Sequence, residues 1–553
     1  MKSKIYALVL AGLCTVIGAA SCQKDFLDRK PLDTYADQDV WSDIRLVETF
    51  VNSKYRVLPH CINGDATASV TGYSAASDEG YSRHNYEGVF TINQGQQSPD
   101  NLSLENWSVD YNYIRSCNLF LSKIDNVQGD ADMKTRLTAE IKFIRAWCYF
   151  DLISRYGGVP IITKIYSLSD ASFVVKRNTY DECVDFVNKD LDAAIAVLPT
   201  SYDGANKGRV TKGGALALKS RLLLYAASKL NNPGGEAGRW QQAADAAKAL
   251  IDLADQGTYS LDQRTDYSKI FLDKSSPEVI MSFGMDGTFY DPTLGDYGSS
   301  LDLYIWPNGF HGWSVYTPSQ NLVDAFEMNN GKMITEPGSG YDATAPYVGR
   351  DPRFYADILY NGATFKGRKL EYFKGGMDSP QSSVESWNAS LTGYSWRKYA
   401  DESYVMGSHG SNQNWIIFRL AEIYLNYAEA KYQLGDEATA RKYLNLVRSR
   451  ASVGLPAVTA TGTDLMDRIA HERAVEFCFE GMRFMDVRRW KIAGQTDNKP
   501  LMGVQLTKNP DASFSYTYFS LQKRKFDESK NYLLPISRDE INKNNLLVQN
   551  PGY

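Results

Sequence analysis

Apolar residues recur at intervals of three and four along much of the chain, which is the spacing of one face of an α-helix. The pattern is clearest at Leu137, Ile141, Ile144, Cys148 and Leu152. The same period, with polar caps before it and Gly or Pro after it, predicts further helices. These cover residues 37–57, 107–127, 180–198, 211–230, 240–253, 415–434, 437–450 and 464–490.

The pattern changes between residues 258 and 410, where Gly, Pro, Asp, Ser, Tyr and Trp are frequent and long helical periods are missing. The tail after residue 490 is predicted to be loop with short extended pieces. The sequence therefore predicts a mainly α-helical protein with long irregular segments and a few short strands.

Two predicted helix pairs have the spacing of tetratricopeptide-like units. One covers residues 421–447, where Ala428 and Ala440 flank the turn at Gly435, and the other covers residues 217–250. Small residues let two helices approach closely, and bulky residues fill the next groove. An ordinary antiparallel helix pair has the same spacing, so this alternative stays open.

Composition narrows the class of protein. The 553 residues make 62.0 kDa, more than one hydrophobic core normally organises, so two domains or one composite domain are expected. The 43% hydrophobic and 23% charged residues are ordinary for a soluble globular chain. A net charge of −5 gives no basic surplus, so no nucleic-acid partner is expected. The 36 Tyr and 10 Trp residues suit ligand grooves as well as cores.

The N-terminus predicts a lipoprotein signal. Lys2 and Lys4 precede an uncharged apolar stretch, residues 5–20, which ends in small residues before Cys22. This pattern is typical of a signal peptide, too short for a membrane span. We expect residues 1–21 to be removed, Cys22 to be lipidated, and residues 22–36 to form a tether to the membrane. Plain secretion, with Cys22 incidental, is the alternative.

The other cysteines after the signal peptide predict no disulfide framework. They are too few and too far apart for one in a chain of this length. Four of them, Cys117, Cys148, Cys183 and Cys478, lie in apolar helical patterns and are expected to be buried.

Enzyme signatures are missing or incomplete. His471 and Glu472 begin a zinc-protease motif, but Val475 stands where the second His is required. No P-loop and no G-x-S-x-G motif occurs. A pair of catalytic carboxylates is not singled out among the acidic residues, so a surface glycosidase remains the weaker alternative. We expect no catalytic residues, no cofactor and no catalytic metal, although Asp-rich loops leave a structural Ca²⁺ open.

The stretch from His471 to Trp490 is dense in Arg, Asp, Glu and aromatic residues. Arg side chains at helical spacing satisfy partly buried carboxylates, so we interpret it as a structural network. An anion site is the alternative interpretation.

Several sequence blocks follow one another in a fixed order up to the C-terminus. They are CQKDFLDRKP (22–31), IKFIRAWCYFDLISRYGGVPII (141–162), GRVTKGGALALKSRLLLYA (208–226), GRDPRF (349–354), FRLAEIYLNYAEA (418–430), ERAVEFCFEGMRFMDVRRW (472–490), YLLPISRDEI (532–541) and LLVQNPGY (546–553). Through these blocks the chain resembles the SusD/RagB family of outer-membrane nutrient-binding lipoproteins. The resemblance covers nearly all of the mature chain and is weakest over residues 270–410.

The resemblance implies a fold and a function. The fold is a tetratricopeptide-like helical-pair scaffold with long irregular ligand-binding segments, as one SusD-like domain over residues 37–553. Its parts are a helical part (37–257), a variable ligand-binding part (258–410), and a second helical part with the tail (411–553). The implied protein is not an enzyme. It is lipid-anchored to the cell outer membrane, faces the extracellular side, binds an oligosaccharide or polysaccharide nutrient, and delivers it to a SusC-like TonB-dependent transporter. Some members of the family bind a peptide instead.

Two clusters are candidates for the ligand face, because an aromatic ring covers the apolar face of a sugar while polar side chains bond its hydroxyl edge. The first spans residues 73–86, and its candidate rings and edge partners are Tyr81, Tyr86, Asp78, Arg83, His84 and Asn85. The second spans residues 290–316, and its candidate rings are Trp306, Phe310, Trp313 and Tyr316. The alternative is that these rings fill a groove of the protein itself.

The remaining tryptophans divide into two groups. Trp387 and Trp396 form a third, weaker candidate cluster. The others that we single out lie in helical patterns and are expected in the core: Trp147, Trp240, Trp415 and Trp490.

Overall fold

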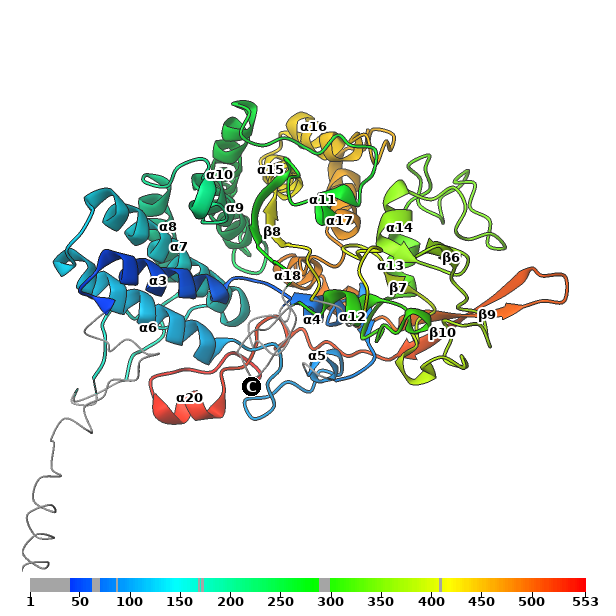
Figure 1. The fold of residues 1–553 in the computed structure, drawn as a ribbon, viewed down its shortest axis with the longest axis horizontal. Coiled ribbons are helices and arrows are strands. Elements are labelled where there is room, and N and C mark those ends of the chain that lie inside the picture. The colour runs from blue at the N-terminus through cyan, green and yellow to red at the C-terminus, as the bar shows by residue number, and fades with distance from the viewer. Residues whose placement is uncertain are drawn as a thin grey trace, which may run out of the picture.

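The computed structural model of the protein describes residues 40–61, 70–85, 88–167, 170, 174–287, 299–406 and 410–553. The predicted signal peptide, Cys22, the tether and Tyr86 lie outside these residues. The chain is mainly helical with a few short strands, as predicted (Figure 1).

A row of helices forms the scaffold. Its members are α6 (Trp107–Lys123), α7 (Ala131–Tyr156), α8 (Tyr180–Ile195), α9 (Lys212–Ala227), α10 (Ala237–Asp255), α15 (Leu420–Gln433) and α16 (Glu437–Arg448). Each helix packs on the next in this order, and the step from α10 to α15 bypasses the whole irregular part of the chain. Both predicted helix pairs, α9–α10 and α15–α16, are therefore present and lie against each other.

Local chemistry explains why these helices begin and turn where they do. The Thr211 side chain caps α9 by accepting a hydrogen bond from the Gly214 amide, as predicted, and Asp436 caps α16 in the same way. Gly435 joins α15 to α16 with a φ of 80°, a conformation that other residues adopt only with strain. Ala428 and Ala440 are fully buried beside this turn, so the two helices approach closely.

Two of the predicted helices are not continuous helices in the structure. Residues 415–434 are not one helix, because Trp415–Arg419 forms strand β8, which pairs antiparallel with β2 (Val279–Phe283). The run WIIFR contains aromatic and β-branched residues, which favour strands, and it is buried throughout although its sheet has only two strands. Residues 464–490 are also interrupted: α17 (Gly462–Glu476) and α18 (Arg483–Arg489) are separated where Phe479 and Gly481 have positive φ.

The irregular part contains only short elements. Its helices are α11 (Lys269–Leu272), α12 (Leu301–Ile305), α13 (Gln320–Ala325) and α14 (Pro352–Asp357). Its strand pairs are β1 (Gly80–Ser82) with β3 (Tyr316–Pro318), β4 (Ile358–Leu359) with β7 (Ser395–Trp396), and β5 (Thr364–Phe365) with β6 (Arg368–Lys369). In Figure 1 this part lies to the right of the N-terminal helices.

The remaining elements lie near the ends of the chain. They are α3 (Ile44–Lys54), α4 (Val70–Ala75), α5 (Val89–Asn93), α19 (Ala493–Thr496), α20 (Arg538–Lys543), β9 (Leu501–Lys508) and β10 (Phe514–Gln522). Strands β9 and β10 form a hairpin that projects from the body in Figure 1, longer than the extended pieces expected there. Among the described residues, no helix is both long enough and apolar enough to cross a membrane.

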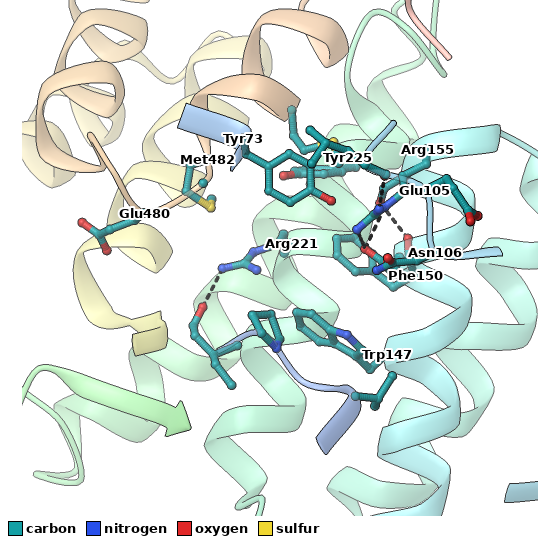
Figure 2. Close-up of a pocket in the computed structure, with 18 of the residues that line it drawn as sticks. Tyr73, Glu105, Asn106, Trp147, Phe150, Arg155, Arg221, Tyr225, Glu480 and Met482 are labelled. Atoms are coloured by element: carbon teal, nitrogen blue, oxygen red, sulfur yellow. Dashed lines mark hydrogen bonds and ion pairs between the residues drawn. The ribbon is translucent and has the colours of Figure 1, made fainter. Parts of the chain in front are cut away.

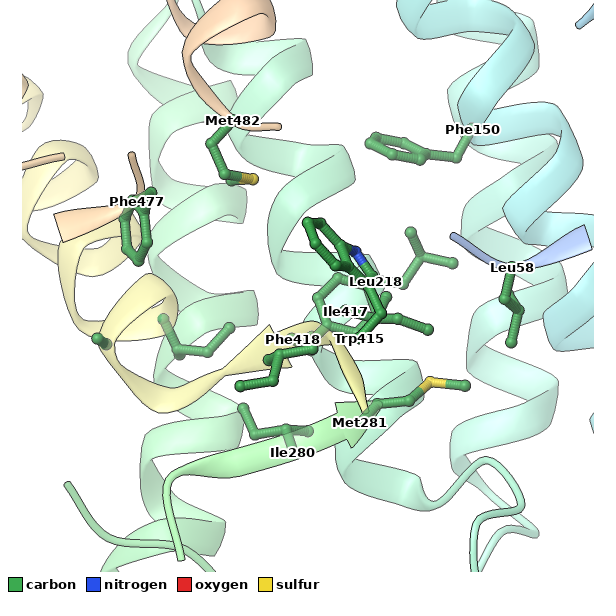
Figure 3. Packing of buried hydrophobic residues seen from close by; sticks show 14 of the residues in the cluster. Leu58, Phe150, Leu218, Ile280, Met281, Trp415, Ile417, Phe418, Phe477 and Met482 are labelled. Carbon is green, nitrogen blue, oxygen red and sulfur yellow. The ribbon is translucent and has the colours of Figure 1, made fainter. Parts of the chain in front are cut away.

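One large hydrophobic cluster runs through the scaffold and the irregular part. Figure 3 shows it where β2 and β8 cross the helices, with Ile417 and Phe418 of β8 and Met281 of β2 below Phe150 in this view. The predicted core residues lie as expected: the four helical cysteines are buried, as are Trp147, Trp240 and Trp415. Trp490 is only partly buried, and its indole N–H donates to Glu429 at 2.7 Å.

A buried network of charges joins the scaffold to the irregular part. Its cations are Arg353, Lys398, Arg419, Arg448 and Arg450, and its anions are Glu278, Glu327, Glu472, Glu476 and Glu480. All of these side chains are at most 6% exposed. The structural interpretation of residues 471–490 is therefore confirmed: these carboxylates are satisfied by guanidinium groups within the protein.

Candidate ligand-binding face

The two predicted ligand clusters lie side by side, because β1 pairs with β3. In this antiparallel ladder Tyr81 faces Thr317 and Ser82 faces Tyr316. The Arg83 amide extends the ladder by donating to the Val315 carbonyl at 2.8 Å. Segments more than 200 residues apart in the sequence thus form one continuous surface. We use the term β1–β3 face for this surface and for the loop that lies against it, which is described next.

A third segment, residues 366–390, completes the β1–β3 face. His311 Nδ1 lies 2.9 Å from Glu385 Oε1, and the Asn308 side-chain amide donates to the Val384 carbonyl at 3.0 Å. The Arg83 guanidinium donates to the Ala389 carbonyl. These bonds fix the loop that carries Trp387 against the turn that carries Phe310 and Trp313.

Close packing at Gly309 explains the glycine in this turn. A Cβ atom there would lie 2.3 Å from Asp378 Oδ1 and 2.4 Å from Arg368 Nη2. Those two side chains form an ion pair at 2.7 Å, and the Arg368 guanidinium lies 4.2 Å from the centre of the Phe310 ring. Only a residue without a side chain lets the ion pair and the ring approach in this way.

Several rings of the β1–β3 face are accessible. Trp387 is 61% exposed, and Trp313 and Phe310 are half-buried. Trp313 lies beside Tyr304, with ring centres 5.8 Å apart and a tilt of 38°. The described rings therefore offer apolar faces to solvent next to polar side chains, as a sugar-binding surface requires.

Two predicted ligand rings are not accessible. Trp306 and Tyr316 are 1% and 2% exposed, so the expectation that they lie at the surface is wrong. The Trp306 indole N–H donates to Asp302 at 3.0 Å, and the Lys366 ammonium lies 4.7 Å from its ring centre. Because neighbouring segments close over them, these rings support the face from below.

Trp396, from the weaker third cluster, is also fully buried. It stacks on Phe479 with ring centres 4.3 Å apart. Its partner in that cluster, Trp387, is the most exposed ring of the β1–β3 face. The polar surroundings of Trp387, ESWNAS, were the signal that could have ranked it higher.

The candidate polar side chains differ in whether they are available to bond a ligand. Asp78 is engaged by Arg483 through two hydrogen bonds of 2.8 Å. Burial alone would raise the pKa of Asp78, but the Arg483 guanidinium lowers it below its usual value. Asp78 therefore serves the fold, and its carboxylate is not available to a ligand.

Tyr81, Arg83 and His84 are half-buried at the β1–β3 face, and Asn85 is exposed. The Asn85 side-chain oxygen accepts a hydrogen bond from the Phe90 amide at 2.9 Å, which leaves its NH₂ group accessible. Burial lowers the pKa of His84, and the neighbouring Arg83 charge lowers it further. Arg83 and Asn85 thus offer N–H donors at this edge of the face.

Comparison with known families identifies the chain. The family model described as "SusD family" matches residues 277–553, and the one described as "Starch-binding associating with outer membrane" matches residues 25–224. The chain belongs to the SusD family.

Similar SusD-family proteins cover most of the chain. A SusD-like protein from Bacteroides ovatus is 27% identical over 510 residues, which are 89% of this chain and 83% of the relative. A SusD-like protein from Bacteroides fragilis has 31% identity and a TM-score of 0.80, with 95% of this chain and 100% of that chain covered. A SusD-like carbohydrate binding protein from the same species has 25% identity and a TM-score of 0.78, with 92% and 99% covered.

This SusD-family chain also has a cavity that none of the candidate rings and edge partners lines, although Tyr73, at the start of residues 73–86, does. It measures about 470 Å³ and lies between α7, α9 and the segment before α18 (Figure 2). Its two arginines are already paired, Arg155 with Asp151 at 2.8 Å and Arg221 with Glu422 at 2.6 Å. The cavity suits a small molecule, whereas the open β1–β3 face can accept one stretch of a long chain. Within the described ranges, no cluster of three or more His, Cys, Asp or Glu side chains is placed to hold a metal ion.

Proposed function

We propose that the protein binds an oligosaccharide or polysaccharide at the β1–β3 face and delivers it to a SusC-like TonB-dependent transporter. The observation that carries the proposal is the pair of accessible indoles, Trp313 and Trp387, beside the fixed donors of residues 83–85. A structurally similar relative is named as a carbohydrate binding protein, which supports the same ligand class.

Capture of a sugar combines stacking on its apolar face with hydrogen bonds to its hydroxyl groups. An indole covers the C–H face of a pyranose, while side-chain donors bond its hydroxyl groups. Water competes for each hydroxyl bond, so each subsite binds weakly. A binding face held next to the transporter raises the local ligand concentration, and weak binding then suffices.

We also propose that Cys22 carries the lipid anchor and that the protein sits on the extracellular side of the outer membrane. The family model that matches residues 25–224 is described as associating with the outer membrane, which supports this location. Attachment by a tether leaves the β1–β3 face free to meet ligand and transporter.

A binding role is favoured over hydrolysis by the state of the acidic side chains. A glycosidase needs two carboxyl groups, one as acid and one as base or nucleophile, on either side of the glycosidic bond. At the β1–β3 face Asp378 is paired with Arg368 and Glu385 with His311. Carboxylates held in this way support a non-catalytic protein, and the proposed binding requires no metal or cofactor.

The test uses the full-length protein purified in detergent, with affinity gels and calorimetry on a panel of soluble glycans. We expect retention by a glycan class, no new reducing ends over hours, and weaker retention after Trp313→Ala. New reducing ends would establish the glycosidase alternative. Binding of a peptide mixture without any glycan binding would establish the peptide alternative and overturn the proposal.

A further inference from the structure

We infer that the glycan is acidic, and that Arg83 binds its carboxylate or sulfate group between the stacking rings of Trp313 and Trp387. This inference rests on the proposed function and names the class of glycan. It follows from the position of Arg83, from its lack of an acidic partner, and from the pairing of the carboxylates of this region with other side chains.

Arg83 is bonded to both of the segments that carry the accessible indoles. Its amide donates to Val315, two residues after Trp313, at 2.8 Å. Its guanidinium donates to the carbonyl of Ala389, two residues after Trp387. The guanidinium is therefore fixed to the segment that carries Trp387, and the Arg83 backbone to the segment that carries Trp313, so a ligand meets the side chain with little loss of entropy.

Arg83 lacks the acidic partner that other arginines of this region have. Arg368 is paired with Asp378 at 2.7 Å and Arg483 with Asp78 at 2.8 Å. In the described part of the chain, Arg83 has no carboxylate partner, and its guanidinium has only the Ala389 carbonyl as a hydrogen-bond acceptor. The other N–H groups of the fork remain for a ligand.

Acidic side chains on the loop bonded to Arg83 are engaged elsewhere. Glu385 on this loop is engaged by His311 at 2.9 Å. Asp378 is fully buried under its pair with Arg368. Because burial disfavours the uncompensated guanidinium charge, an anion from the ligand would stabilise it.

A pyranuronate or a sulfated sugar matches this arrangement. The planar guanidinium fork binds carboxylate and sulfate oxygens in pairs, with stronger hydrogen bonds than it forms with neutral hydroxyl groups. Such an acid group projects from the edge of the sugar, while the C–H face stays free to stack on an indole. A neutral glycan would fill the ring subsites and leave the Arg83 charge without a partner.

The test compares acidic and neutral glycans on full-length protein in detergent. The probes are polygalacturonate, its fully methyl-esterified form, alginate, chondroitin sulfate, chondroitin and amylose. We expect at least one acidic probe to bind, with affinity that falls as NaCl rises, and the two neutral probes, the methyl ester and amylose, to bind about tenfold or more weakly. Chondroitin keeps the glucuronate carboxylates of chondroitin sulfate and lacks only its sulfates, so the comparison of these two probes distinguishes a sulfate from a carboxylate ligand.

Variants then assign the effect to Arg83. Arg83→Met is expected to lower acidic-glycan affinity by about tenfold to a hundredfold, and Arg83→Lys by less, because lysine keeps the charge without the fork. Arg45→Met removes the same charge from an exposed position on α3 and should leave affinity unchanged. Thermal melting of each variant confirms that the fold is intact.

Binding of amylose or the methyl ester without preference for acidic probes would overturn the inference and leave the proposed function standing. Equal loss of acidic-glycan affinity in Arg83→Met and Arg45→Met would also overturn it, because the effect would then come from net charge. Failure to bind any glycan would overturn both.

Discussion

Arg450 donates to Glu476 at 2.9 Å, and both side chains are fully shielded from solvent. Arg419 and Arg353 donate to the same carboxylate at 2.6 Å and 2.8 Å. Glu476, at the end of α17, thus joins β8, the segment after α16 and the start of α14. This carboxylate holds the irregular part of the chain against the helical scaffold.

Replacement of Glu476 by Gln should therefore destabilise the protein strongly. The change removes the buried negative charge that three guanidinium groups share. Breaking a buried ion pair in this way lowers the free energy of unfolding by about 3–5 kcal/mol. Urea denaturation measures the loss. Glu437→Gln removes a half-exposed partner of Arg441 on α16 and should cost less than about 1 kcal/mol. Equal costs for the two variants would contradict the role of the network.

Glu79 is predicted to make stability depend on pH in the opposite sense from most carboxylates. Burial raises its pKa from 4.5 to about 8, and the charge of Asp78 adds to the shift, while Arg483 and Lys398 oppose it. Because the folded pKa lies above the unfolded one, the stability that Glu79 contributes is full below pH 4.5 and is lost as pH rises to about 8.

Glu79→Gln should remove this dependence, since a neutral amide imitates the protonated acid. At pH 8.5 we expect the variant to be more stable, with a free energy of unfolding roughly 2–5 kcal/mol above that of the unmodified protein. At pH 4 the difference should vanish. Denaturation curves across this range provide the measurement, and a difference that is constant with pH would refute the assignment.

Two tryptophans from the candidate clusters should respond in opposite ways. Trp387→Ala removes an exposed ring, so we expect a melting temperature within experimental error and glycan affinity lower by about tenfold. Trp306→Ala empties a buried site and should cost about 3–5 kcal/mol of stability. Calorimetric melting and affinity gels separate the two effects. Unchanged glycan retention in Trp387→Ala would remove this ring from the ligand site.

The proposed lipid anchor at Cys22 predicts a change of location when this residue is replaced. Cys22→Ser should release the protein from membranes, because more than one acyl chain is needed for stable attachment and this variant can carry none. Ultracentrifugation of cell lysates measures the distribution. Cys61→Ser changes a cysteine of the folded part and should remain in the membrane fraction. If Cys22→Ser also stays there, the anchor lies elsewhere.

Much of the scaffold could be predicted because its signals are local. The Thr211 and Asp436 caps, the turn at Gly435 and the apolar period specify helices within a few residues of sequence. The sequence does not reveal the strand at residues 415–419, because a short apolar run is compatible with a buried helix as well as with a strand that pairs with β2.

The candidate site could be predicted only in part, because it depends on contacts between residues far apart in the chain. The aromatic and polar residues of 73–86 and 290–316 indicate two ligand segments, but not their pairing through β1 and β3. The exposure of a ring is also set by distant neighbours. Trp306 is covered by Phe365 and Lys366, which no local pattern around Trp306 reveals.

The β1–β3 ladder also has a consequence for biogenesis. Tyr81 and Thr317 are 236 residues apart, and the loop that fixes Arg83 lies further on, at Ala389. A nascent or truncated polypeptide that ends before this point has no assembled ligand surface. The proposed ligand surface is thus assembled late, because most of the chain must be present before Arg83 meets the Ala389 carbonyl.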